Sequence, residues 1–198
     1  MKLAKRCFDL SWTILGLLVI WPLLLLIALA IKFDDRGPVF FRQERVGYRG
    51  RPFYIWKFRT MVPNAELIGR AITVGRDPRI TKVGHWLRKT KLDELPQLIN
   101  VLVGEMSLVG PRPEVPRYVS LYTAEQRKVL EVFPGITDPA SIKYRDENEV
   151  LARAVNPDQA YINEVMPEKI RINLDYVERA GVAQDFVIIL QTLIKLVR

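Results

Sequence analysis

The sequence contains one cysteine and one histidine, and these shortages exclude several common kinds of site. Cys7 alone cannot form an internal disulfide, which is typical of a protein in a reducing compartment. His85 has no cysteine or second histidine at a zinc-ligand spacing, so we interpret it as structural. The chain also lacks internal repeats and low-complexity tracts. Its hydrophobic fraction of 49% excludes general disorder, and 198 residues are enough for one domain with a core.

Charge is absent from one long stretch near the N-terminus. Residues 10–31 carry no charged side chain, and about 20 such residues in a helix cross a bilayer of about 30 Å. Pro22 lies in the middle and predicts a kink, because it removes one backbone hydrogen bond. Basic residues flank both ends, which favours a re-entrant helix with both ends on the cytoplasmic side. An ordinary kinked membrane anchor is the alternative, and Trp12 and Trp21 are candidate membrane-anchoring residues in either case.

The remaining charge is strongly positive. Lys and Arg number 30 against 22 Asp and Glu, a net charge of +8 that suits anionic partners such as phosphorylated metabolites or an anionic membrane face. There is no recognisable nucleic-acid-binding motif, and the aromatic residues are not interleaved with the basic ones, so we expect no nucleic acid partner. A non-catalytic, membrane-anchored module that binds acidic polymers or lipids is the alternative to an enzyme.

A β-hairpin is predicted after the apolar segment. Residues 39–46 and 53–60 are rich in strand-forming side chains, and glycines and a proline mark the turn between them. Lys57 and Arg59 share one face of the second strand, where two cations can hold a phosphate. A solvated strand face explains the same pattern equally well.

Two adjacent carboxylates, Asp93 and Glu94, precede an apolar helix. The helix is predicted from i, i+3, i+4 spacing, with Pro96 in its first turn and Gly104 at its end. The side chains expected to be buried are Leu95, Leu98, Ile99, Leu102 and Val103. Asp93 is then expected near the N-cap, where the partial positive charge of the helix keeps carboxylates ionised and attracts phosphate. Simple capping by Asp93 is the alternative.

Other cations and one amphipathic helix complete the pattern. Arg112 stands between Pro111 and Pro113, which restrict the backbone and preorganise the guanidinium for a carboxylate or phosphate, although a plain rigid turn has the same sequence. Arg88 lies on a basic helix that runs to Lys91. Residues 184–198 predict an amphipathic helix that either docks on the core or lies at a membrane surface.

Taken in order, these motifs resemble those of the bacterial sugar transferases, the small monotopic phosphoglycosyl transferases. The resemblance covers nearly the whole chain and combines the proline-interrupted N-terminal segment with five short motifs. These motifs are GPVFFRQERVG at 37–47, KFRTM at 57–61, LDELPQL at 92–98, GEMSLVGPRPE at 104–114 and PGIT at 134–137.

The resemblance implies an α+β, mainly helical fold. It has a Pro-broken re-entrant N-terminal membrane helix, a short β-hairpin and amphipathic interfacial helices. Residues 1–36 would form the membrane helix and its flanks, and residues 37–198 a membrane-associated catalytic domain on the cytoplasmic face of the bacterial inner membrane. Such enzymes move a sugar 1-phosphate from a UDP-sugar to undecaprenyl phosphate, or another polyprenyl phosphate, and release UMP. This step initiates the assembly of surface glycans, exopolysaccharide or lipopolysaccharide.

The resemblance also implies roles for individual residues. Asp93 would be the nucleophile that forms a covalent phosphosugar, and Asp93 and Glu94 would hold the required Mg²⁺. Arg112, Arg88, Lys57 and Arg59 would neutralise the diphosphate. A related fold that transferred the sugar without its phosphate would release UDP instead of UMP.

One segment departs from the family pattern. After PGIT, many members continue with GLAQVNGR, whereas this chain has DPASIKYR, and we expect Lys143 or Arg145 to supply the cation near the nucleotide. The chain also lacks the additional N-terminal membrane helices of larger members, so a minimal version is expected. The sequence leaves open the sugar, the glycan pathway and the oligomeric state, a homodimer included.

Overall fold

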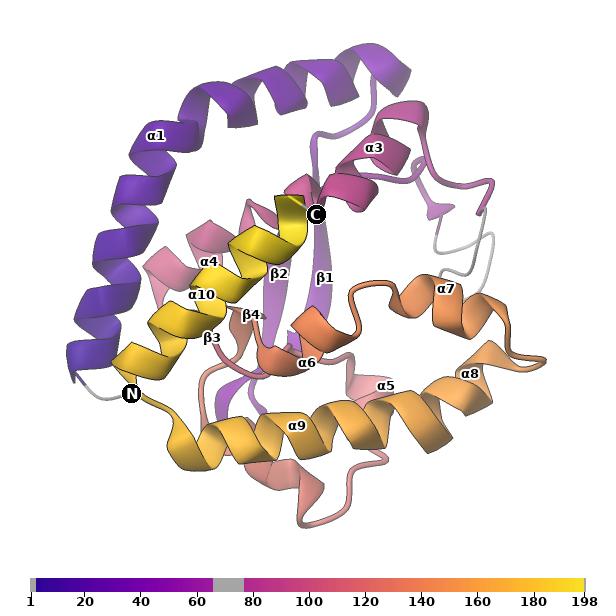
Figure 1. The fold of residues 1–198 in the computed structure, drawn as a ribbon. Helices are drawn as coiled ribbons and strands as arrows, with labels where there is room; N and C mark the ends of the chain where they lie inside the picture. The colour runs from indigo at the N-terminus through magenta and orange to yellow at the C-terminus, as the bar shows by residue number, and fades with distance from the viewer. Residues whose placement is uncertain (1–2, 66–76, 198) are drawn as a thin grey trace.

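The computed structural model describes residues 3–65 and 77–197. Helix α1, Leu3–Asp35, is one continuous helix with Pro22 inside it. Figure 1 shows it running up one side of the molecule and then bending across the top, as the predicted kink requires. Among the described residues, α1 is the one helix long and apolar enough to cross a membrane, and only 11% of its most apolar window is buried.

The two ends of α1 dock on the same body. Near its N-terminus, Arg6 donates hydrogen bonds to the carbonyls of Val101 (2.6 Å) and Leu102 (2.9 Å), at the end of α4, Gln97–Val103. Near its C-terminus, Ile27 and Ile31 are buried in one hydrophobic cluster with Phe58 and Leu87, which come from β2 and α3. The middle of α1 remains exposed, including Trp12 and Trp21. Both ends of the apolar helix therefore lie against one domain.

The described part of the chain forms two small sheets. Strands β1, Phe40–Val46, and β2, Pro52–Phe58, form the predicted antiparallel hairpin, with Phe40 opposite Phe58 and Val46 opposite Pro52. The sequence did not predict the second pair, in which β3, Ser107–Val109, lies parallel to β4, Gly135–Thr137. Glycines allow this close approach, because a Cβ atom on Gly135 would lie 2.1 Å from the backbone nitrogen of Gly110.

Short helices connect and cover these strands (Figure 1). Besides α1 and α4, the helices and single helical turns are η1, Tyr48–Gly50; α3, Lys82–Thr90; η2, Leu92–Glu94; α5, Pro116–Val119; η3, Gln126–Glu131; α6, Pro139–Lys143; α7, Glu147–Ala152; α8, Pro157–Ala160; η4, Tyr161–Val165; α9, Met166–Arg179; and α10, Val182–Val197. The expected mainly helical α+β class is confirmed.

Helix α10 presents two different faces. Ile188 is buried in a cluster with Val109 and Tyr176, and Asp185 is fully buried beside Lys5 of α1. Phe186, Leu190, Leu193 and Ile194 are exposed on the same helix. Of the two placements that the sequence left open, docking on the core is therefore observed, and an apolar face stays uncovered.

The buried face of α4 was predicted wrongly. The buried residues are Gln97, Asn100 and Val101, whereas Val103 is 64% exposed. Asn100 explains the difference, because its side chain accepts from the Trp56 N–H (2.9 Å) and donates to the Tyr54 carbonyl (2.8 Å). These hydrogen bonds satisfy the backbone of strand β2, so a polar side chain, not the apolar stripe, determines which face turns inward.

Candidate active site

The backbone places Asp93 and Glu94 on a single 3-10 turn between two helices. Helix α3 ends at Thr90, and Lys91 adopts a left-handed conformation (φ 59°) that turns the chain into η2. Helix α4 begins only at Gln97, with Pro96 as its N-cap residue. The expectation that Asp93 lies near the N-cap of this helix is therefore wrong by one turn. The N-terminus of α4 therefore lies one turn beyond the pair, and no side chain caps it.

Glu94 is held by two cations from distant parts of the chain. Lys57 of β2 donates to its Oε1 at 2.8 Å, and Arg112 makes a bidentate contact, with Nη1 3.0 Å from Oε2 and Nη2 against Oε1. The Glu94 side chain is only 14% exposed. Burial alone would favour the neutral acid, but Arg112 and Lys57 outweigh it and hold the pKa of Glu94 well below its usual range. Glu94 is therefore a fixed anion.

Asp93 lies in a different environment from its neighbour. It is 8% exposed and accepts no hydrogen bond from any residue in the described ranges, and its Oδ1 atom is completely buried. Burial raises the pKa of Asp93, Lys57 and Arg88 act in the opposite direction, and the charge of Glu94 raises it further. A carboxylate that is desolvated and free of hydrogen bonds is a stronger nucleophile than a capped one. The geometry thus distinguishes Glu94, which two cations hold in place, from Asp93, which accepts no hydrogen bond from the described residues.

Arg88 completes the group of cations around the pair. It lies on α3, and burial lowers its pKa while the charges of Asp93, Asp77 and Glu94 act to raise it. Lys57 behaves similarly, with a pKa that burial lowers and Glu94 raises. Glu94 raises the pKa of Arg112. The structure therefore brings together five of the residues that the sequence singled out: Lys57, Arg88, Asp93, Glu94 and Arg112.

Three of the cations expected at the site pair with other groups instead: Arg59, Arg145 and Lys143. Arg59 follows the last residue of β2 and is buried, where it forms a bidentate ion pair with Asp35 at the end of α1 and donates to the Met61 carbonyl at 3.0 Å. It therefore joins α1 to the rest of the domain and does not share a phosphate clamp with Lys57. The guanidinium of Arg145 is exposed and donates to the Lys195 carbonyl in α10. Lys143, the other candidate, forms an exposed ion pair with Glu168 at 2.9 Å.

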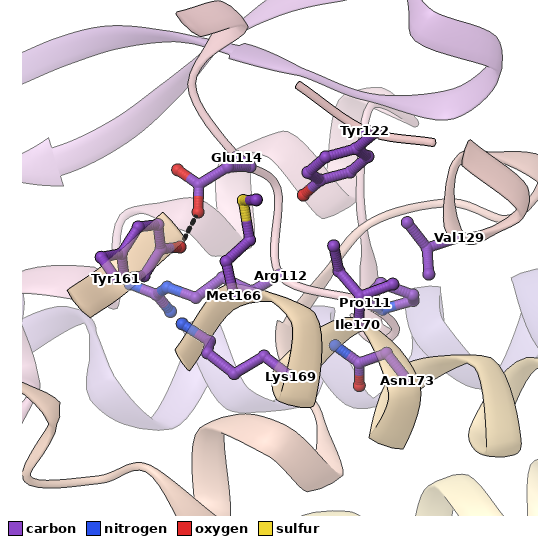
Figure 2. A pocket seen from close by; sticks show the side chains of 10 residues that line it. All are labelled: Pro111, Arg112, Glu114, Tyr122, Val129, Tyr161, Met166, Lys169, Ile170 and Asn173. Atoms are coloured by element: carbon purple, nitrogen blue, oxygen red, sulfur yellow. Dashed lines mark hydrogen bonds between the residues drawn. The ribbon is translucent and has the colours of Figure 1, made fainter. Parts of the chain in front are cut away.

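A small cavity lies on the other side of Arg112 (Figure 2). Its walls combine the Pro-Arg-Pro segment with η4 and α9, and its lining residues are Pro111, Arg112, Glu114, Tyr122, Val129, Tyr161, Met166, Lys169, Ile170 and Asn173. The volume is about 30 Å³, and since one water needs about 10–15 Å³ it is enough for a water or two. In Figure 2, Tyr161 donates a hydrogen bond to Glu114, which also pairs with Arg45 at 3.1 Å. Sequence reasoning singled out Arg112 and its neighbour Pro111 but missed the other lining residues, of which only Glu114, next to the Pro-Arg-Pro motif, carried a signal.

Comparison with known proteins decides the family. The family model described as "Bacterial sugar transferase" matches residues 1–198. The exopolysaccharide production protein ExoY of Sinorhizobium fredii is 33% identical over 206 residues, covering 96% of this chain and 84% of that protein. The chain belongs to the bacterial sugar transferase family.

Longer proteins match this sugar transferase over part of their length. The UDP-glucose:undecaprenyl-phosphate glucose-1-phosphate transferase of Escherichia coli is 40% identical over 204 residues, which cover 98% of this chain and 40% of that protein. The undecaprenyl-phosphate glucose phosphotransferase of Komagataeibacter xylinus is also 40% identical, over 96% of this chain and 35% of its own. This sugar transferase thus spans about two fifths, or less, of the length of these two relatives.

The carboxylate pair fits a magnesium ion. No cluster of three or more metal-ligating side chains occurs in residues 3–65 and 77–197. Mg²⁺, however, is commonly held by only one or two carboxylates together with substrate phosphates and water. Asp93 accepts no hydrogen bond there, and Oε2 of Glu94 has a single donor, so each retains an acceptor position. The expected ligands, Asp93 and Glu94, are therefore chemically suitable.

Proposed function

We propose that this sugar transferase moves a sugar 1-phosphate from a UDP-sugar to undecaprenyl phosphate, or another polyprenyl phosphate, and releases UMP. One observation carries the proposal. Asp93 is a buried carboxylate that accepts no hydrogen bond from the described residues, and it lies beside a carboxylate that two cations hold in place. Phosphoryl transfer between two anions needs a positioned nucleophile and neutralisation of charge, and this group of residues supplies both. The names of the relatives support undecaprenyl phosphate as acceptor and exopolysaccharide assembly as the process.

The reaction proceeds in two displacements at one phosphorus atom. In the first, an oxygen of Asp93 attacks the β-phosphorus of the UDP-sugar. An O–P bond forms to the aspartate while the bond from this phosphorus to the bridging oxygen breaks, and UMP leaves with the electron pair. In the second, an oxygen of the polyprenyl phosphate attacks the same phosphorus, and the Asp93 carboxylate leaves. The ionised nucleophile needs no proton transfer in either step, so no general base is required.

The cations bind and orient the two anionic substrates in this scheme. Lys57 and Arg112 keep Glu94 ionised and, in this proposal, neutralise the bound diphosphate, and Arg88 supplies positive charge beside Asp93. Mg²⁺, held by Asp93 and Glu94, would neutralise charge on the phosphate oxygens. Because UMP departs before the acceptor binds, one group of cations serves both substrates in turn.

We also propose that α1 is re-entrant and lies in the bacterial inner membrane, with the catalytic domain on the cytoplasmic face. The docking of both ends of α1 on one domain supports this topology. Trp12 lies 6.3 Å, ring centroid to ring centroid, from Phe186 on the exposed face of α10, so the two helices offer one apolar surface to lipid. Cysteine labelling in intact cells tests this topology. Native Cys7 reports on the N-terminal end of α1, and Arg36→Cys in a Cys7→Ser background reports on the C-terminal end. Reagent access to the two ends from opposite sides of the membrane would refute the re-entrant form.

Intact-protein mass spectrometry tests the reaction itself. Wild type and Asp93→Asn are incubated with Mg²⁺ and a panel of UDP-sugars, beginning with UDP-glucose and without a lipid acceptor. We expect a sugar-phosphate adduct on wild type alone, with one UMP released per adduct, and loss of the adduct when undecaprenyl phosphate is added. Release of UDP, or an adduct that persists in Asp93→Asn, would contradict the mechanism. No turnover with any donor and acceptor would favour the alternative of a non-catalytic module.

A further inference from the structure

Arg45 of β1 is a largely buried cation to which the reaction scheme gives no role. Its side chain is 17% exposed, with Nη1 donating to Oε1 of Glu114 at 3.1 Å and Nη2 donating to Oε1 of Gln43 at 2.7 Å. Its Nε atom is fully buried and has no partner among the described residues. Burial lowers the pKa of Arg45, Glu114 acts in the opposite direction, and the positive charge of Arg112 lowers it again, which places the two guanidinium groups near each other.

Stability alone does not account for this pair of Arg45 and Glu114. A buried guanidinium loses its hydration, and replacing a buried ion pair with apolar side chains of similar volume is often neutral or stabilising. For Arg45 the penalty is larger, because one of its N–H donors is buried without a partner. The pair therefore needs another explanation, and the backbone group that Arg45 binds supplies one.

Arg45 fastens the backbone next to Arg112. Pro111 and Pro113 have no N–H, so hydrogen bonds can hold them only through their carbonyl groups. Before Arg112, the N–H of Gly135 donates to the Pro111 carbonyl at 3.1 Å. After Arg112, Nη1 of Arg45 donates to the Pro113 carbonyl at 3.2 Å and is the one donor to that carbonyl among the described residues. Arg45 thus supplies one of the two anchors that flank Arg112.

Glu114 holds the Arg45 side chain in this place. Its Oε1 atom also accepts from the N–H of Val115 at 2.8 Å, and its Oε2 atom accepts from the hydroxyl of Tyr161 (Figure 2). The backbone carbonyl of Glu114 accepts from the N–H of Val46, the residue after Arg45, at 2.9 Å. Side chain and backbone of Glu114 therefore join β1, the Pro-Arg-Pro segment and η4, and Arg45 has little freedom to turn away.

We propose that Arg45 is a positioning residue for Arg112, whose backbone it fixes through the Pro113 carbonyl. The Arg112 guanidinium then meets Glu94 and the diphosphate in one orientation. A planar guanidinium binds two oxygens only in a fixed geometry, so its action depends on where the backbone places it. Arg45 itself contacts neither the substrate nor the reacting atoms. This inference rests on the proposed function, because it concerns a group that acts in that reaction.

A double-mutant cycle tests the inference. Arg45→Met keeps a long unbranched side chain and removes its donors. It is combined with Arg112→Lys, because a lysine ammonium is a point charge on a flexible stem and depends less on backbone placement. The kcat for UMP release is measured with undecaprenyl phosphate and the UDP-sugar that wild type turns over. Arg45→Met should lower kcat roughly 10- to 100-fold in the wild-type background, since a misplacement of about 1 Å costs up to about 100-fold, and by no more than about threefold in the Arg112→Lys background.

Arg117→Met is the matched control. Arg117 lies three residues after Glu114 and also pairs with a carboxylate, Asp158, but on the surface. This substitution should leave kcat unchanged in both backgrounds. A loss for Arg117→Met as large as that for Arg45→Met would show that removing any arginine of this region slows the enzyme, and it would overturn the inference.

The remaining outcomes separate a positioning role from a structural one. Equal fold losses for Arg45→Met in the two backgrounds would show a merely structural role, and wild-type kcat in Arg45→Met would show none; either result overturns the inference. Thermal melting reports the folded fraction of each variant.

If Arg45→Met does not fold, Tyr161→Phe replaces it in the cycle, because it removes one hydrogen bond to Glu114 and keeps the ring. The expected loss is then roughly 3- to 10-fold with Arg112 in place, the equivalent of one hydrogen bond, and none with Arg112→Lys. Equal losses in the two backgrounds would again overturn the inference and leave the proposed function standing. A wild-type protein that releases no UMP with any donor and acceptor would instead refute the proposed function, and the inference with it.

Discussion

Replacing Arg112 with alanine removes the bidentate contact on Glu94 and leaves Lys57 as the one remaining cation that bonds to it among the described residues. Removing one partner of a buried ion pair costs about 3–5 kcal/mol, and a single hydrogen bond to a charged group contributes about 1.5–3 kcal/mol. The Arg112 side chain is 30% exposed and Lys57 stays in place, so we expect a loss of about 2–4 kcal/mol in the free energy of unfolding at pH 7. For a domain of this size, the melting temperature then falls by about 4–15 °C.

The loss should depend on pH in a definite direction. Arg112 and Lys57 lower the pKa of Glu94 in the folded protein, so the ionised form contributes stability above the unfolded pKa of about 4.3. That contribution disappears as the pH falls toward the lower folded pKa. Without Arg112 the folded pKa moves back up. The difference in the free energy of unfolding between wild type and Arg112→Ala therefore has its full size at pH 7 and becomes smaller below about pH 4.

Thermal and urea unfolding in detergent micelles, at pH 7 and at pH 3.5, measure both effects. Arg117→Ala is the matched control, because Arg117 pairs with Asp158 on the surface, where its side chain is 60% exposed. Its substitution should change the free energy of unfolding by no more than about 1 kcal/mol. The reasoning fails if Arg112→Ala loses less than about 1 kcal/mol at pH 7, or loses the same amount at both pH values.

Four further substitutions test other parts of the structure. Asp93→Asn should raise the melting temperature by a few degrees at pH 7 and leave it unchanged at acid pH. Burial raises the pKa of Asp93, so its ionised form, present at pH 7, opposes folding. A lower melting temperature for the variant at pH 7 would contradict this. Arg59→Ala and Asp35→Ala should each lower stability by about 2–4 kcal/mol, and the double variant by little more than either alone; additive losses in urea unfolding would disprove the ion pair. Asn100→Ala should lose about 2–4 kcal/mol in the same assay, since two backbone groups of β2 lose their partner; wild-type stability would refute this role.

Residues that carried a local pattern were placed correctly. The β-hairpin, the long apolar helix and the basic helix before Lys91 each depend on neighbours in the sequence, and propensity and periodicity report such neighbours well. Lys57, Asp93, Glu94 and Arg112 were recognised because each lies in a motif that the family shares, whereas Arg88 lies on the predicted basic helix that runs to Lys91. Arg59 lies in such a motif too, yet it binds Asp35 from α1, because the end of β2 is packed against the end of that helix.

The buried face of α4 shows where periodicity fails. An apolar stripe predicts the inward face of a helix only when water covers the opposite face. Here backbone groups of β2 take the Asn100 side chain as their hydrogen-bond partner, so a polar residue of α4 faces inward. Gln97 and Asn100 were consequently overlooked, although they lie four and seven residues after Asp93. The parallel pairing of β3 with β4 was missed for a related reason, because its partners are separated by 28 residues and each strand has only three.

By itself, the sequence determined the class of fold, the family and the identity of the two carboxylates, because composition, periodicity and motif spacing are properties of the chain as written. Tertiary structure alone decided how those carboxylates differ. Lys57 and Arg112, from segments 37 residues before and 18 residues after Glu94, bind that residue and leave Asp93 buried without a hydrogen bond. Desolvation and ion pairing depend on which groups meet in space, and no local pattern records that.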